Sequence, residues 1–140
     1  MIHRSARTKR KVRSTLAGEA EACDSATDSG YYLSVYTYDI ITGTRATRRS
    51  SVLDLSIPLY AVTDCKSLYD VVQKVQPQLE EKRTAIDVAS IKETLHRDHL
   101  KWVPSDHMLA DSLTKIDKKL REKLTEFLRR PYIALKNATG

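Results

Sequence analysis

The sequence predicts an α/β fold with a small parallel strand pair flanked by helices. Two short apolar runs, residues 57–63 and 99–103, are typical of strands, and the residues around them follow helical patterns. Strands that alternate with helices are expected to pair in parallel. Two strands make a thin sheet, because a parallel pair normally belongs to a larger sheet covered on both faces.

The first element expected is a helix over residues 16–35. Ser14 or Thr15 precedes it, and a hydroxyl there can accept a hydrogen bond from an unpaired N–H group of the first turn. Gly18, Gly30 and several Asp, Ser and Thr residues weaken the pattern towards its end. Residues 42–56, with Gly43 and three arginines, predict a long loop.

Four further helices are expected beyond the first strand. Residues 66–74 form a short one that ends before Pro77, and residues 106–114 another. Residues 80–95 form a longer helix with one apolar face, made of Thr84, Val88, Ile91 and Leu95. The last helix ends near Pro131, and its apolar residues are Ile116, Leu120, Leu124, Phe127 and Leu128.

Length and composition indicate one domain, over residues 14–130, between a basic leader (1–13) and a C-terminal tail (131–140). Neither a secretion signal nor a membrane-spanning run is recognised, so we expect an intracellular protein, cytoplasmic or nuclear, with no membrane partner. Cys23 and Cys65 have no metal-type spacing and fit free thiols in a reducing compartment.

The chain is basic, with a formal net charge of +6 and a pI of about 9.4. Part of the excess lies in the leader, at Lys9, Arg10, Lys11 and Arg13, and part at Arg45, Arg48 and Arg49. Nucleic-acid phosphates are the commonest partners of such patches. A solvated basic tail is the alternative.

Three carboxylates are candidates for a metal site. Asp64 follows the first strand, Asp111 comes soon after the second, and Glu19 lies in the first helix. Ligands and catalytic groups collect at the carboxyl ends of strands in open α/β sheets, and Mg²⁺ prefers carboxylate oxygens. Two such ions can hydrolyse a phosphodiester. Alternatively, Glu19 faces water, Asp64 caps a helix and Asp111 complements a helix dipole.

Several neighbours of these acids are auxiliary candidates. His107 precedes Asp111 by one helical turn and could orient substrate, shuttle a proton or assist product release, or be a plain surface residue. Lys66 and Ser67 begin a helix, where phosphate can bind, or are ordinary first-turn residues. Trp102 is expected in the core.

Five segments together resemble one family. They are residues 9–19, 62–70, 81–87, 101–104 (Lys-Trp-Val-Pro) and 109–115 (Leu-Ala-Asp-Ser-Leu-Thr-Lys). In this order they resemble the ribonuclease H domain at the C-terminus of copia-type retrotransposon Pol polyproteins. The resemblance implies a ribonuclease H-like fold that cuts the RNA strand of RNA–DNA hybrids with two Mg²⁺ ions, or Mn²⁺, and works beside an upstream reverse transcriptase region.

The resemblance also assigns site residues. Glu19 matches the family's helix glutamate, with Glu21 as its rival, while Asp64 and Asp111 match two of its aspartates. The family domain starts with antiparallel strands, the first of which carries a further aspartate, whereas the first Asp here is Asp24. We therefore expect an incomplete, N-terminally truncated ribonuclease H-like domain with weak or no hydrolysis. A non-catalytic nucleic-acid-binding remnant and a degenerate transposon-derived protein are the alternatives.

Overall fold

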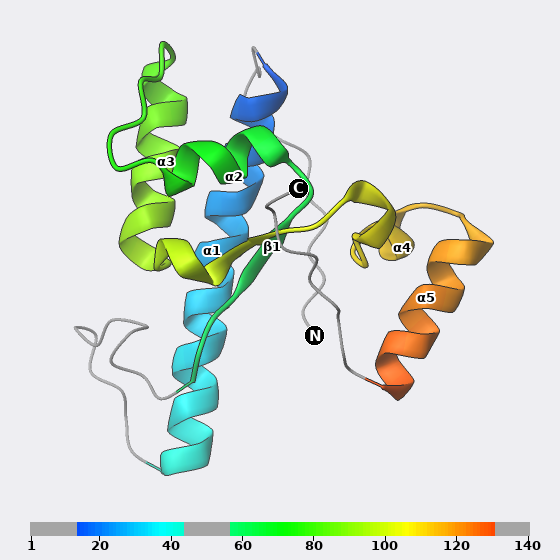
Figure 1. Cartoon of the computed structure of the whole chain (residues 1–140). Coiled ribbons are helices and arrows are strands. Elements are labelled where there is room, and N and C mark those ends of the chain that lie inside the picture. The colour runs from blue at the N-terminus through cyan, green and yellow to red at the C-terminus, as the bar shows by residue number, and fades with distance from the viewer. Residues whose placement is uncertain (1–13, 44–56, 131–140) are drawn as a thin grey trace.

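The computed structural model describes residues 14–43 and 57–130. The fold is mixed α/β, mostly helical, with a two-stranded parallel sheet. Helices α1 (Thr15–Thr42) and α3 (Lys82–Thr94) pack against each other, and β1 (Ala61–Thr63) crosses α1 (Figure 1). The basic leader, the C-terminal tail and the arginines of residues 44–56 lie outside the described residues.

Helix α1 begins as the sequence predicts and ends later. The Ser14 hydroxyl accepts a hydrogen bond from the N–H of Ala17 at 3.2 Å, which caps the start. The predicted end at residue 35 is wrong, because the helix continues to Thr42. Thr37 and Thr42 donate their hydroxyls to backbone carbonyls four residues earlier, so these polar residues are accommodated within the helix. Gly43 ends it, with a left-handed φ of 65°.

The two predicted strands exist and pair in parallel. Strand β1 pairs with β2 (Leu100–Trp102), and Val62 lies opposite Lys101. Both strands are shorter than predicted. Pro58 has no N–H to donate to a ladder, and a 3-10 helix, η1 (Arg97–His99), occupies the predicted start of β2. The register fixes which ends of the two strands lie together, and so places the residues that follow Thr63 near those that follow Trp102.

The core lies where α1, α2 (Lys66–Gln73), α3 and β2 meet. Its fully buried side chains include Leu68 and Val72 of α2 and Val88 and Ile91 of α3. The predicted apolar face of α3 is confirmed, since Thr84, Val88, Ile91 and Leu95 are all buried. On α1 the buried residues are small: Ala17, Ala20, Thr27 and Ser34. Small side chains let α3 approach α1 closely, so the helix that carries Glu19 is held firmly against the core.

The predicted helix over residues 106–114 is wrong. Residues there form two short pieces, the 3-10 helix η2 (Ser105–His107) and the single turn α4 (Asp111–Thr114). Helix α5 (Lys118–Arg129) follows and packs mainly against α4, with none of its residues buried. The ammonium of Lys123 donates to the carbonyl of Asp106 at 2.6 Å and ties α5 to η2. Asp111 therefore lies on a single helical turn between η2 and α5.

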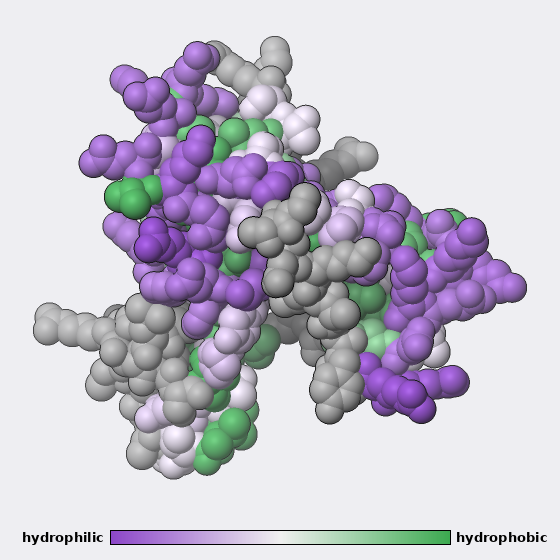
Figure 2. Space-filling model, viewed as in Figure 1, coloured by the Kyte–Doolittle hydropathy of each residue, from purple (hydrophilic) through white to green (hydrophobic). Residues whose placement is uncertain are grey.

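The surface is largely polar, with apolar side chains at the far end of α1. Leu33, Ile40 and Ile41 of α1 are exposed, and Figure 2 shows an apolar area at the lower end of the molecule, where α1 ends. Within the described residues, no helix has both the length and the apolar character needed to cross a membrane.

Candidate functional site

Three separate elements carry the candidate carboxylates. Glu19 lies in the second turn of α1, Asp64 follows β1, and Asp111 is the first residue of α4. The chain turns at Asp64, between β1 and the following helix α2, and two hydrogen bonds fix this corner. The Trp102 indole N–H donates to the Asp64 carbonyl at 3.1 Å, and the Cys65 N–H donates to the Thr63 hydroxyl oxygen at 3.1 Å. The strand pairing thus sets the position of the Asp64 backbone.

The pKa of Glu19 responds to burial and to the charges of the other two acids. Burial raises the pKa of the Glu19 carboxyl above its ordinary value of 4.5, and the negative charges of Asp64 and Asp111 raise it further. Asp64 and Asp111 therefore each lie within electrostatic range of Glu19. Glu21, the rival in the sequence, lies about 200° further round the helix axis.

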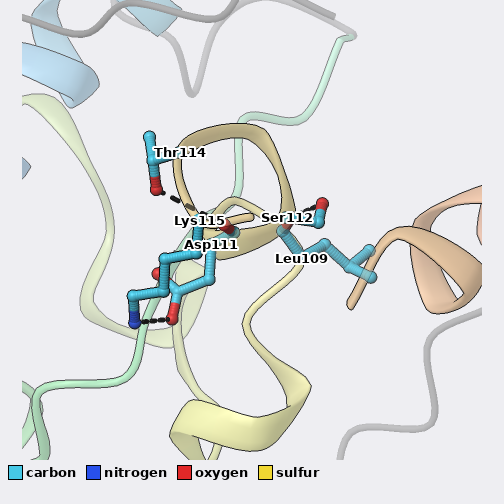
Figure 3. A network of polar contacts seen from close by, with 5 residues as sticks. All are labelled: Leu109, Asp111, Ser112, Thr114 and Lys115. Carbon is cyan, nitrogen blue, oxygen red and sulfur yellow. Dashed lines mark hydrogen bonds and ion pairs between the residues drawn. The ribbon is translucent and has the colours of Figure 1, made fainter. Parts of the chain in front are cut away.

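Asp111 has a cationic partner. Lys115 Nζ lies 2.6 Å from Asp111 Oδ2, and the Lys115 backbone N–H donates to the Asp111 carbonyl at 2.8 Å (Figure 3). The Ser112 hydroxyl donates to the carbonyl of Leu109, which ties the first turn of α4 to the preceding segment. Charge at Asp111 is thus partly neutralised from within α4. Lys115 ends the segment 109–115, and its i,i+4 spacing from Asp111 is the sequence signal for such a pair.

The donor chemistry of Glu19, Asp64 and Asp111 fits Mg²⁺, which prefers carboxylate oxygens. Their present positions do not complete a ligand set, because no three His, Cys, Asp or Glu side chains in the described residues form a group that could hold a metal ion. The three carboxylates are therefore coupled in charge without being closed around a common point.

The structure does not support two of the alternative roles considered for the acids, a helix cap at Asp64 and a fully solvated side chain at Glu19. Asp64 does not cap α2, since Cys65 is the N-cap residue of that helix and makes no side-chain cap hydrogen bond. Glu19 is partly buried rather than fully solvated. Asp111 does lie at the N-terminus of α4, where a carboxylate complements the backbone dipole, although α4 is only one turn long.

His107 does not share a helix with Asp111, so the prediction that the two lie one helical turn apart on the same face is wrong. It lies in η2, and its Nδ1 is 2.9 Å from Asp106 Oδ1. The adjacent His107 imidazole lowers the pKa of the Asp106 carboxyl. The nearest carboxylate partner of His107 in these contacts is therefore Asp106.

Lys66 lies close to the Asp64 corner. Its ammonium is 2.8 Å from Asp70 Oδ1, and it stands 5.1 Å from the ring centre of Tyr69 and 5.6 Å from that of Trp102. Trp102, expected in the core, is partly exposed. Ser67 is exposed beside Cys65, with the hydroxyl 3.2 Å from the sulfur. Phosphate binding by Lys66 and Ser67 stays a prediction, and the predicted contacts of Lys9, Arg10, Lys11 and Arg13 lie outside the described residues.

Charge is distributed unevenly along the chain. The described residues hold 14 of the 24 Lys and Arg residues and 17 of the 18 Asp and Glu residues, a net charge of −3. The basic excess lies in residues 1–13, 44–56 and 131–140. The candidate carboxylates therefore belong to an acidic body, which favours a cation more than a phosphate as the direct ligand.

Both cysteines are free and partly buried at the edge of the core. Burial raises the pKa of the Cys23 thiol above its ordinary value of 9.0. A hydrogen bond with Thr27 opposes this effect, while the charges of Asp24, Glu19 and Cys65 add to it. The Cys23 thiol is therefore mainly protonated at neutral pH.

Comparison of this chain with protein-family models, with curated proteins and with solved structures finds no match.

Proposed function

We propose that the chain is the C-terminal part of a ribonuclease H-like domain of the retrotransposon Pol type. In this proposal Glu19, Asp64 and Asp111 bind Mg²⁺ for hydrolysis of the RNA strand of RNA–DNA hybrids. The observation that carries it is the packing of α1, the helix with Glu19, against the strand pair whose first strand runs directly into Asp64. The charges of Asp64 and Asp111, both distant from Glu19 in sequence, also raise the pKa of the Glu19 carboxyl.

The fold supports the proposal at a coarser level. A helix that carries a glutamate packs against a parallel strand pair, and an aspartate follows the first strand at its carboxyl end. This is the edge at which open α/β sheets collect ligands. The order of these parts along the chain agrees with the order expected from the resemblance.

Each residue has a defined task in the proposed reaction. The carboxylates of Glu19, Asp64 and Asp111 would hold the divalent ions, which when bound supply an activated water and stabilise the leaving oxygen. Trp102 fixes the Asp64 corner through its indole N–H. Lys66 stands at the start of α2 on the same corner, where an ammonium can contact a substrate phosphate. The further aspartate that the resemblance implies has no match in this sequence, so a two-metal site would be incomplete and we expect weak or no hydrolysis.

The test is cleavage of a labelled RNA–DNA hybrid by the whole chain with Mg²⁺ or Mn²⁺, together with Mn²⁺ binding in the absence of nucleic acid. We expect Mn²⁺ binding that Glu19→Gln, Asp64→Asn and Asp111→Asn each weaken about tenfold or more, because each removes a charged ligand. Asp98→Asn is the matched control, since its exposed side chain pairs only with a histidine among the contacts described. Unchanged Mn²⁺ affinity in all three variants would overturn the proposal.

Non-catalytic nucleic-acid binding is the second candidate. It is favoured by the net charge of +6 and by the absence of a closed ligand group among the described residues. This candidate predicts hybrid binding that weakens steeply with salt and is unaffected by Asp64→Asn. The same variants therefore separate the two functions.

A further inference from the structure

Helix α1 carries an apolar stripe that is not part of the core. Ala26, Ser29, Leu33, Tyr36 and Ile40 follow one another at 3-4-3-4 spacing, the pattern with which one helix packs along another. The side chains of Leu33, Tyr36 and Ile40 are 43%, 64% and 82% exposed. Figure 1 shows the C-terminal half of α1 extending below its crossing with β1. This stripe, the α1 seam, is therefore a helix-packing face that is largely exposed to solvent.

Helix α5 carries a matching stripe. Leu120, Leu124 and Phe127 lie on one face at 4-3 spacing and are partly exposed, and Leu128 beside them is 65% exposed. When the two helices run antiparallel, this spacing coincides with that of the last three residues of the α1 seam. The 12 residues of α5 span about 18 Å, which is enough to cover most of the seam.

The two helices have opposite charge. Helix α1 contains five acidic residues and no Lys or Arg, a net charge of −5, whereas α5 contains five basic and two acidic residues, a net charge of +3. Like charges oppose the pairing of α1 with a second α1, or of α5 with a second α5, and opposite charges favour the pairing of α1 with α5. Charge complementarity therefore selects α5 as the helix that covers the α1 seam.

Within one chain, α5 is held elsewhere. It packs mainly against α4, and the ammonium of Lys123 donates to the carbonyl of Asp106 at 2.6 Å. Figure 1 shows α5 apart from α1. To cover the seam of its own chain, α5 would have to give up these contacts, whereas α5 of a second copy would keep them.

We propose that two copies of this chain form a dimer in which α5 of each copy packs antiparallel on the α1 seam of the other. The two contacts are identical and related by a two-fold axis, so the assembly is closed. No residue of the seam or of α5 belongs to the candidate site, so the inference does not depend on the proposed function.

The test is sedimentation velocity of the whole chain over a range of protein concentrations, at low and at high NaCl. The double variant Tyr36→Ala/Ile40→Ala truncates the α1 seam, and Phe127→Ala/Leu128→Ala truncates the face of α5. Neither pair includes a buried residue, and circular dichroism verifies that each variant folds.

We expect the wild-type chain to dimerise, with a Kd that rises with NaCl because salt screens the attraction between the helices. Each double variant should raise the Kd about tenfold or more, as the loss of aromatic and aliphatic anchors does at interfaces. The control Val75→Ala/Ile86→Ala removes two side chains that are 81% and 66% exposed and lie outside both helices, and it should stay within about twofold.

An equimolar mixture of the two interface variants gives the sharpest result. Each variant alone lacks both contacts of the dimer, but in the mixture the intact α5 of one variant meets the intact seam of the other. The mixture should therefore dimerise more tightly than either variant alone.

A wild-type chain that stays monomeric overturns the inference, as does a dimer that salt does not weaken. Loss of the dimer in only one of the two interface variants, or a mixture no tighter than its components, would mean that like helices pair and would overturn it as well. A monomeric chain that binds vesicles of anionic lipid through α5 would assign that helix to a membrane surface instead.

Discussion

Glu19→Gln should stabilise the protein at neutral pH in the absence of divalent cations. The pKa of Glu19 is raised in the folded state by burial and by the charges of Asp64 and Asp111, so folding penalises its ionised form. Asp111 is partly neutralised by Lys115, which leaves Asp64 as the less compensated neighbour. Glutamine keeps the shape of the side chain and removes the charge.

The size of the gain follows from the exposure of the site. Glu19 is only partly buried, so solvent screens its interactions, and a screened charge pair of this kind is worth about 0.2–1 kcal/mol. Partial desolvation acts in the same direction, so we expect a gain in the upper part of this range, about 0.5–1 kcal/mol. For a domain of this size that corresponds to a rise in Tm of roughly 2–5 °C.

The raised pKa of Glu19 also determines how the stability of the protein changes with pH. A carboxyl whose folded-state pKa lies above its unfolded value binds more protons in the folded state, so stability falls as pH rises through these values. Well below the ordinary pKa of 4.5 the carboxyl is protonated in both states and the penalty is absent. The advantage of Glu19→Gln should therefore appear above that pH and disappear below it.

Thermal unfolding followed by circular dichroism in a chelator-containing buffer, at about pH 4 and about pH 7, measures both effects. Asp28→Asn is the matched control, because it removes one exposed charge from the same helix. The reasoning is refuted if Glu19→Gln loses stability at neutral pH, or if Asp28→Asn gains as much.

Four further predictions rest on other parts of the structure. Ile91→Ala leaves a cavity in the fully buried core and should cost about 2–5 kcal/mol in urea unfolding, whereas Ile86→Ala, at an exposed position of the same helix, should cost under about 1 kcal/mol. Ser14→Ala removes the cap of α1 and should cost about 1 kcal/mol, with a loss of helical signal; no loss would contradict the cap. Trp102→Phe should cost about 1 kcal/mol by removing the hydrogen bond to Asp64, and should weaken Mn²⁺ binding if that bond positions the carboxylate. Iodoacetamide should modify Cys23 more slowly in the folded chain than in urea at about pH 8, because burial raises its pKa; equal rates would refute this.

Local patterns predicted most of the elements because each pattern had a direct physical cause. The 4-3-4 spacing of Thr84, Val88, Ile91 and Leu95 identified the buried face of α3, and the strand–helix–strand order predicted parallel pairing. The errors fell where local signals compete. The polar second half of α1 was expected to leave the helix, yet back-bonded hydroxyls and Gly43 carry it to residue 42.

The site was harder to predict than the fold because it depends on distances between elements. Sequence spacing placed Asp64 after a strand, but only the packed structure shows that its charge reaches Glu19. A single helix over residues 106–114 would place His107 and Asp111 on one face. The structure breaks this helix after His107, so the two residues lie in separate elements. The ion pair between Lys115 and Asp111, by contrast, could have been predicted from the sequence, because an i,i+4 spacing brings a base and an acid together on a helix.

Glu19, Asp64 and Asp111 do not form a closed ligand group in the part of the chain that the structure describes. Like charges raise one another's free energy, so the side chains separate, one becomes harder to ionise, and any cation within reach is recruited. Glu19 shows the second effect and Asp111 the third, through Lys115. Among the described contacts Lys115 pairs with Asp111 and not with the other two acids, so a divalent cation at this site stays a prediction that Mn²⁺ binding tests.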